Sequence, residues 1–477
     1  MAPRYGIIGA LAGALLTSAT ALADDPTVLP NLLPFPNATG MAATYSTQGT
    51  LDLTNPFFAS LGSNGRSCAS CHVPASGWTI TPGEVEARFE STAGTDPIFR
   101  TNDGSTSPHA DVSSVAARRT AYRLLLEKGL IRVGLPVPSD AEFELAAVDD
   151  PYGYASAADL SLFRRPLPST NLKFLSTVMW DGRETFTDPA SPDCILGTTT
   201  CFASLHVNLA DQANSATLGH AQAAAALDDE ERAAIVAFET SLFTAQIYDD
   251  ESGPVTARRA TGGPRALAEN PFYFGMNDAV SGDYRTGALF NPSVFTLYDT
   301  WDATTKIGFA QADETARGVQ ARLAVARGQT LFNSKPIRIT DVKGLNDDLH
   351  APLIQGTCTT CHDTPAAGNH SIPAPLDIGL ADGARRTPDL PLYTLRNKAT
   401  GEMVQTTDPG RALITGKWKD IARFKGPVLR ALAARPPYFH NGMAADLEAV
   451  VDFYNTRFDI GFTEQEKRDL VAFLRTL

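Results

Sequence analysis

The 477-residue sequence has few cysteines and no excess of basic residues. Six cysteines are too few to hold a chain of this length together as a disulfide scaffold. Lys and Arg number 40 against 53 Asp and Glu, which gives a net charge of −13. This balance argues against a nucleic-acid binder, because such proteins neutralise phosphates with clustered basic side chains. The apolar share of 43% supplies ordinary hydrophobic cores, and the length predicts two or three domains of about 150 residues each.

Long apolar runs are also absent after the first 23 residues. Residues 1–23 begin with the basic Arg4, continue with an apolar run over 7–16 and end in Ala-Leu-Ala, the pattern of a secretory signal peptide cleaved before Asp24. A membrane anchor is the alternative, but the run is interrupted by Gly, Ser and Thr and is shorter than the roughly 20 residues that a span needs. We therefore expect an exported, periplasmic protein without a membrane span.

The cysteines form three close pairs, and two of these have the pattern that attaches haem c. Residues 68–72 read CASCH and residues 358–362 read CTTCH. Two thiols separated by two residues reach the two vinyl groups of one haem, and the adjacent histidine serves as the proximal iron ligand. A zinc site or a redox dithiol is the alternative, but each pair is followed directly by histidine and no βαβ context for a dithiol is present. The sequence thus predicts two covalently bound haem c groups, held by Cys68, Cys71 and His72 and by Cys358, Cys361 and His362.

The third pair, Cys194 and Cys201, lies in a loop, and neither cysteine is followed by histidine. In an oxidising compartment such a pair predicts a local disulfide. A free, reactive thiol pair is the alternative.

An internal repeat indicates the architecture. Residues 227–242 align without a gap on residues 462–477, and both segments start with a cap residue, carry acids in the first turn and then place apolar residues at helical spacing. A weaker similarity links residues 57–61, before the first haem motif, with residues 329–333, before the second, and predicts a short helix at each place. Each haem motif is thus enclosed between an early and a late helix, as in a small cytochrome c domain.

We expect a mainly α fold of two cytochrome c-like haem domains with long irregular loops and insertions. The N-terminal domain covers residues 24–310, with its extra length around 85–165 and a turn-rich connector over 250–310. The C-terminal domain covers residues 311–477 and opens on a helix from about Asp313 to Phe332.

Further motifs resemble a known family. Residues 180–183 read WDGR after RPLPSTN at 165–171, while FKGPVLR at 424–430 precedes PYFHNG at 437–442. Together with the two haem motifs in this order, they resemble the bacterial di-haem cytochrome c peroxidases and MauG-type enzymes over most of residues 45–477. The resemblance implies an oxidoreductase in which hydrogen peroxide reacts at the N-terminal haem. The C-terminal haem would relay electrons from a small redox protein, or from a protein substrate that is thereby modified.

The resemblance also implies roles for single residues around the haems. Trp180 of WDGR would lie between the haems as an electron relay; a core tryptophan at a turn is the alternative. The sixth ligand of the second haem iron in this family lies fourteen residues beyond the histidine of PYFH, a position that Tyr454 holds here. A phenolate favours oxidised iron, whereas methionine raises the reduction potential. Met443 or Met403 would be the ligand if Tyr454 is only a core residue, and His440 is expected beside this haem as a hydrogen-bond partner.

Peroxide cleavage needs a group above the first haem that moves a proton between the two oxygens. The family supplies a Gln and a Glu downstream of WDGR; Gln212 fits the first, and His220 stands near the position of the second. Histidine has a pKa suited to acid–base catalysis, but His220 would close the site if it bound the iron instead. His206 is a second contender for either role.

The family also holds a calcium ion between its haem domains, partly through backbone oxygens just before PYFH. Pro437 offers one such carbonyl, but Arg435 and Arg165 stand where the family has neutral ligands, which disfavours a cation.

The remaining histidines, His109, His350 and His370, have no motif around them and are expected to be solvent-exposed loop residues. An alternative function is a non-enzymatic di-haem electron carrier, with both irons permanently six-coordinate. A third is an oxygenase-like enzyme acting on an organic polymer or small molecule.

Overall fold

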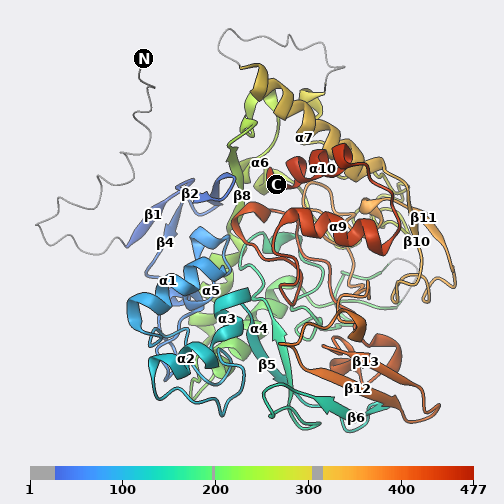
Figure 1. Cartoon of the computed structure of the whole chain (residues 1–477). Coiled ribbons are helices and arrows are strands. Elements are labelled where there is room, and N and C mark those ends of the chain that lie inside the picture. The colour runs from blue at the N-terminus through green and yellow to red at the C-terminus, as the bar shows by residue number, and fades with distance from the viewer. Residues whose placement is uncertain (1–26, 196–198, 303–314) are drawn as a thin grey trace, which may run out of the picture.

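The computed structural model describes residues 27–195, 199–302 and 315–477. The predicted signal peptide, its cleavage before Asp24 and the predicted helix start at Asp313 lie outside these ranges. The expectation of a mainly α fold is wrong, because only 31% of the chain is helical and 18% is strand, distributed over several sheets (Figure 1). The strands escape sequence analysis for two reasons. They are short and pair across long separations, and β7 (Leu160–Arg164) is buried at every residue, so it shows no polar–apolar alternation.

All strand pairs between the named strands are antiparallel. One sheet has four strands, one has three, and the others have two. The four-stranded sheet has the order β2 (Pro34–Asn37), β3 (Gly40–Ser46), β8 (Leu242–Asp249) and β9 (Gly253–Pro254); the three-stranded sheet has the order β13 (Met403–Thr406), β12 (Leu392–Asn397) and β6 (Phe143–Asp149). The pairs are β1 (Val28–Pro30) with β4 (Thr50–Asp52), β5 (Ile131–Leu135) with β7, and β10 (Ile337–Ile339) with β11 (Ile354–Gly356).

The helices occupy both halves of the chain, including the 85–165 segment. Those before residue 310 are α1 (Pro82–Thr92), α2 (Val115–Ala121), α3 (Arg123–Lys128), α4 (Leu205–Gly219), α5 (Asp229–Thr240) and α6 (Pro264–Glu269). Those of the second half are α7 (Ala316–Ser334), α8 (Ala412–Thr415), α9 (Leu447–Arg457) and α10 (Glu464–Arg475), and α10 packs against α7 and α9 (Figure 1).

The internal repeat reappears as two matching aromatic contacts. The ring of Phe238 in α5 lies 5.2 Å from that of Phe57, and the ring of Phe473 in α10 lies 5.8 Å from that of Phe332. Phe57 in turn lies 6.2 Å from the ring of His72, and Phe332 lies 5.9 Å from that of His362. Both repeat helices also begin at a capping box, in which a side chain at the N-cap and one three residues later exchange hydrogen bonds with the backbone. Each haem motif is therefore packed against its own copy of the repeat.

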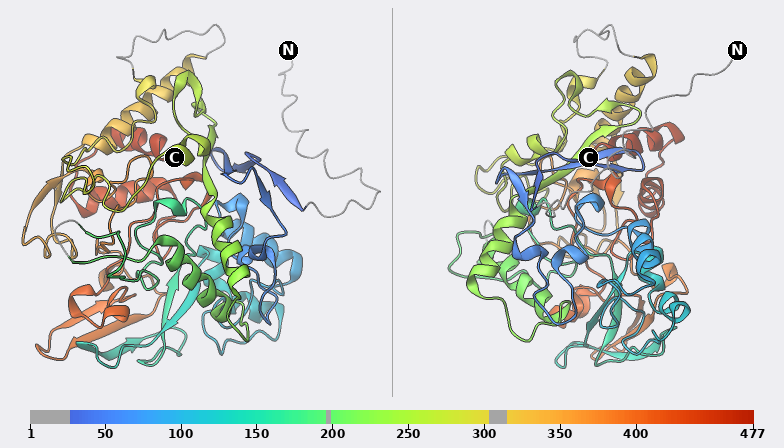
Figure 2. Two further views of the ribbon diagram at one scale, coloured as in Figure 1. Left: turned by 180° about the vertical axis from the view of Figure 1, so that it is seen from behind. Right: turned by 90° about the vertical axis from the view of Figure 1, so that its left-hand side faces the viewer.

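The two halves of the chain are joined by direct pairing. β6 of the first half pairs with β12 of the second, and Figure 2 shows the same segments side by side from two further directions. The Arg164 guanidinium, 2% exposed, binds Asp181 at 2.5 Å and Asp408 at 2.7 Å. A backbone hydrogen bond of 2.9 Å from Lys425 to Trp180 brings the WDGR motif against FKGPVLR, and one of 2.6 Å from Arg165 to His440 brings RPLPSTN against PYFHNG.

Candidate haem sites and the residues between them

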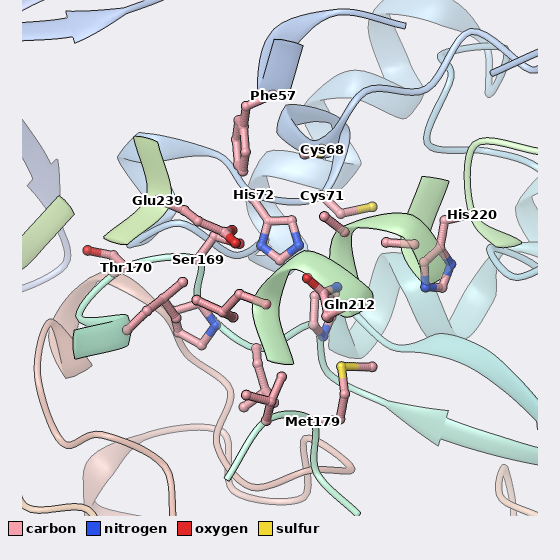
Figure 3. Close-up of a pocket in the computed structure, with 18 of the residues that line it drawn as sticks. Phe57, Cys68, Cys71, His72, Ser169, Thr170, Met179, Gln212, His220 and Glu239 are labelled. Carbon is pink, nitrogen blue, oxygen red and sulfur yellow. The ribbon is translucent and has the colours of Figure 1, made fainter. Parts of the chain in front are cut away.

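The first haem motif opens into a cavity. Cys68, Cys71 and His72 line it (Figure 3). Residues of α4 and of the WDGR motif also line it. His72 donates a hydrogen bond from Nδ1 to the backbone oxygen of Trp78 at 3.0 Å. This bond fixes the tautomer and leaves Nε2 as the nitrogen that can bind iron. Burial lowers the pKa of His72 to about 4, so the ring is neutral, as an iron ligand must be.

The second motif repeats this arrangement in a cavity of its own. Cys358, Cys361 and His362 line it, and His362 donates from Nδ1 to the backbone oxygen of Gly368 at 2.6 Å. The four motif cysteines form no disulfide, and they are divided between two cavities. This separation fits two haem attachments and does not fit one zinc site built from four thiolates.

Buried cations between the cavities fit the charge of bound haem. Arg165, Lys425 and Arg435 line both cavities, and Arg430 lines the first. Burial lowers the pKa of Lys425 to about 7 and that of Arg165 to about 9, in both cases with help from the charge of Arg435. No ion pair among the described residues includes any of these four cations, and Nε and Nη2 of Arg430 have no hydrogen bond there. Buried cations need anionic partners, which the propionate groups of haem c supply.

Two of the predicted catalytic residues lie in the first cavity. Gln212 and His220 both come from α4 or its C-cap and line the cavity together. They are eight residues apart, little more than two helical turns, so both face the cavity. Figure 3 shows His220 on the opposite side of His72 from Glu239. The other contender, His206, is exposed near the start of α4 and does not line this cavity.

Asp103 orients His220, although no sequence motif marks Asp103. Nδ1 of His220 lies 2.5 Å from Oδ2 of Asp103, whose other oxygen pairs with the buried Arg66. Burial alone would raise the pKa of Asp103, but the hydrogen bond from His220 and the charge of Arg66 hold it below its usual range. Asp103 belongs to the 85–165 insertion and has no motif around it, so its contact with α4 is visible only in three dimensions.

Glu239 is a second missed residue, and here the repeat contained a signal. It lines the first cavity from α5, and burial raises its pKa to about 8, so this carboxyl group is neutral at pH 7. The gapless alignment pairs Glu239 with Leu474, which lines the second cavity. An acid at a position that is apolar in the other copy distinguishes the two haem cavities. Met179 also lines the first cavity (Figure 3).

Trp180 lines both cavities. Its Nε1 donates a hydrogen bond of 2.8 Å to the backbone oxygen of Arg165, which fixes the indole. The indole ring lies 6.2 Å from the imidazole of His440 in an edge-on arrangement. The tryptophan is therefore held rigidly in the wall between the two haem motifs.

Of the three residues considered as sixth ligand of the second haem iron, only Tyr454 is among the described residues that line the second cavity. It comes from α9, and burial raises its pKa well above the usual range. Met403 is 64% exposed at the start of β13, and Met443 does not line the cavity.

His440 lies in the same cavity wall. Its ring stacks on Phe424 at 4.0 Å between centroids, and it is 1% exposed. Burial lowers its pKa to about 4, and neither ring nitrogen has a hydrogen bond within the described part of the chain. Its role as a hydrogen-bond partner of the haem stays a prediction.

The residues before PYFH do not fit a calcium ion. Calcium would need free carbonyl oxygens there. Nη2 of Arg165 instead donates to the backbone oxygens of Ile80 at 2.7 Å and of Arg435 at 3.3 Å, and Nη1 donates to that of Lys128 at 3.1 Å. A guanidinium thus takes the carbonyl groups that a cation would use.

Two further predictions concern the third cysteine pair and the remaining histidines. Cys194 and Cys201 form a disulfide. His109 and His350 are exposed, but the expectation that His370 is an exposed loop residue is wrong, because it is 7% exposed and lies beside Asp363. None of the described helices is long and apolar enough to span a membrane.

Comparisons with known proteins give partial matches. The chain is 29% identical over 224 residues to the cytochrome-c peroxidase IdrP1 of Pseudomonas sp. (strain SCT), which covers 42% of this chain and 49% of that protein. It is 32% identical over 127 residues to the cytochrome c551 peroxidase of Nitrosomonas europaea, and the match covers 26% of this chain and 32% of that protein. It is 45% identical over 65 residues to the methylamine utilization protein MauG of Methylorubrum extorquens, and the match covers 11% of this chain and 18% of that protein. The matches thus span about half the length of the first relative and less of the others.

No family model matches the chain. A solved structure, a MauG-like protein associated with microbial copper homeostasis, aligns over 96% of this chain and 95% of that one, with a TM-score of 0.34 and 17% identity. A likeness at this level supports no conclusion. The curated relatives confirm the resemblance to the bacterial cytochrome c peroxidases and MauG that the motifs indicate.

Proposed function

We propose that this protein is a periplasmic di-haem c oxidoreductase that uses hydrogen peroxide at the haem bound to Cys68 and Cys71. The observation that carries the proposal is the difference between the two cavities. His220, which Asp103 orients, lines the first cavity, whereas Tyr454 lines the second. The cytochrome-c peroxidases and MauG among the relatives support the same chemistry.

The haem irons supply the redox chemistry, and the chain supplies proton transfer. Nε2 of His220 accepts a proton from the bound peroxide oxygen and returns it to the oxygen that leaves as water. Asp103 holds Nδ1 of the same ring and stabilises the imidazolium form that exists between these two transfers. The side-chain amide of Gln212 positions the peroxide by hydrogen bonding. Overall, hydrogen peroxide takes up two electrons and two protons to give two water molecules.

Trp180 relays electrons between the two sites in this proposal, since its indole lines both cavities and is fixed by the bond to Arg165. His362 and Tyr454 would hold the second haem iron, with Tyr454 as a phenolate, which favours oxidised iron. His72 would hold the iron of the first haem. The electrons come from a small redox protein or from a protein substrate that is thereby modified. The net charge of −13 suits a basic partner.

The variant His220→Gln tests the proton-transfer step. Loss of the imidazole is expected to slow the reaction of the oxidised protein with peroxide by about 10²-fold or more. The rate is measured by stopped-flow absorption of the haems. His206→Gln is the matched control, because His206 is exposed on the same helix. An unchanged rate in His220→Gln would remove the residue from the mechanism. A faster reaction would show that His220 closes the site as an iron ligand.

A further inference from the structure

Three buried side chains of types that bind metals, Asp278, Asp363 and His370, lie close together outside the two CxxCH motifs. Asp278, Asp363 and His370 are 1%, 0% and 7% exposed. One potential ligand atom from each lies within 4.8 Å of the other two, and in the described ranges this is the only such group of three or more. Asp363 and His370 belong to the loop after the second haem motif, and Asp278 belongs to the 250–310 connector.

Polar side-chain atoms without a hydrogen bond are concentrated here. A buried polar group without a partner is costly, and native proteins contain few of them. Within the described residues, the Asp278 turn and the 363–371 loop contain six: Asp278 Oδ2, Asp363 Oδ2, Thr364 Oγ1, Asn369 Oδ1, His370 Nδ1 and Ser371 Oγ. Three of the six belong to the group itself, one on each of its members.

Each carboxylate has one oxygen fixed by the backbone and one left over. Oδ1 of Asp363 accepts a hydrogen bond of 2.7 Å from the backbone N–H of Ser371. Oδ1 of Asp278 accepts one of 2.6 Å from the backbone N–H of Ser281 and one of 2.7 Å from its hydroxyl. Such outer bonds are typical of carboxylates that bind metal, because they orient the ligand and leave the second oxygen free.

The spacing of Asp363 and His370 matches that of two ligands of one ion. Nδ1 of His370 lies 3.2 Å from Oδ2 of Asp363, yet the two atoms do not meet the geometry of a hydrogen bond. Two atoms that each lie about 2.1 Å from a zinc-like ion at tetrahedral or octahedral angles are about 3.0–3.4 Å apart. The distance is therefore that of two neighbouring ligands.

We propose that Asp278, Asp363 and His370 bind a divalent ion of the zinc or manganese type. Two carboxylates and a neutral imidazole balance a double positive charge, and the imidazole favours such an ion over magnesium or calcium. The ion ties the connector to the loop that contains Gly368, the hydrogen-bond acceptor of the haem ligand His362. Because His370 also lines the second cavity, the ion supports the second haem from the wall of that cavity.

Metal analysis of the holoprotein tests this proposal independently of peroxide chemistry. After incubation with Zn²⁺ and desalting, the wild type should retain about one equivalent of zinc per chain in addition to its haem iron. The variant Asp278→Asn should bind Zn²⁺ at least about tenfold more weakly in calorimetric titration, because it loses a charged ligand while keeping its shape. Asp283→Asn is the control, since Asp283 lies in the same turn but binds Tyr273 and the backbone of Thr286 instead.

Wild-type protein alone provides a second measurement if Asp278→Asn does not fold. Bound Mn²⁺ should show coupling to one histidine nitrogen in its pulsed electron–nuclear spectrum. Zinc retention below about a tenth of an equivalent, with no nitrogen coupling for Mn²⁺, would overturn the proposal. The group would then be a buried imidazolium between two carboxylates, or a site filled by ordered water.

Discussion

Nδ1 of His220 lies 2.5 Å from Oδ2 of Asp103, so the one histidine that α4 presents to the first cavity is oriented by a carboxylate from the 85–165 insertion. The second cavity also has a histidine beside a carboxylate, because His370 lines it and lies 3.2 Å from Asp363, but this cavity differs in having Tyr454 in its wall. The geometry of the His220–Asp103 pair at the first cavity underlies the predictions for Asp103.

Replacing Asp103 by Asn should slow the peroxide reaction by about 10- to 100-fold, because the imidazolium of His220 loses its stabilising charge. Stopped-flow absorption measures the rate. Asp111→Asn is the matched control, since Asp111 is exposed in the same insertion. Equal rates for the two variants would contradict the role of Asp103.

The same carboxyl group predicts a dependence of stability on pH. The folded-state pKa of Asp103 is lowered, so its stabilising effect is present above the unfolded value and is lost as the pH falls through the folded value. The difference in unfolding free energy between wild type and Asp103→Asn should therefore narrow below about pH 4. Denaturant unfolding at several pH values measures it, and a gap that widens in acid would have the wrong sign.

Replacing Tyr454 by Phe should change the absorption and EPR spectra of the second haem, because the iron loses its phenolate ligand. Met443→Leu should leave both spectra unchanged, as Met443 does not line the second cavity. A Tyr454 variant with the same spectra as the wild type, or a changed spectrum in the Met443 variant, would contradict Tyr454 as a ligand of this haem iron.

Replacing Trp180 by Phe should slow electron exchange between the haems while leaving each haem's own spectrum intact. Rapid-mixing absorption after reduction of one haem measures the exchange rate. Trp418→Phe serves as control, because Trp418 packs against the core cluster around Phe143 and lines neither cavity. Equal exchange rates in both variants would leave Trp180 as a core residue.

The buried contact between the halves should matter for stability. Asp408→Asn removes one of the two carboxylates of Arg164 and should lower the free energy of unfolding by about 3 kcal/mol, because it leaves a buried charge undercompensated. Asp149→Asn should change it little, since Asp149 pairs with Arg386 at the surface. Chemical denaturation of both variants decides this.

Local patterns in the sequence were sufficient for the haem motifs and the repeat helices. The CxxCH spacing is dictated by the two vinyl groups of one haem, and α5 and α10 follow from capping boxes and helical periodicity. The strands were missed because their partners are distant, as with β6 and β12, or because both faces are buried, as in β7.

Residues that act through tertiary contacts left little or no local trace. Asp103 contacts His220 although the two are 117 positions apart in the sequence. Asp278 of the 250–310 connector lies close to His370 of the loop after the second haem motif. The absence of a motif around His370 predicts an exposed residue, yet His370 is buried beside Asp363. Glu239 is the exception, since comparison with Leu474 in the repeat points to it.

EPR spectroscopy of the oxidised protein during a peroxide titration tests the central claim most directly. We predict a high-spin ferric signal from an open first haem that disappears as peroxide is added, beside a low-spin signal from the second haem. Two low-spin signals in every redox state, neither of which responds to peroxide, would contradict the account and indicate an electron carrier.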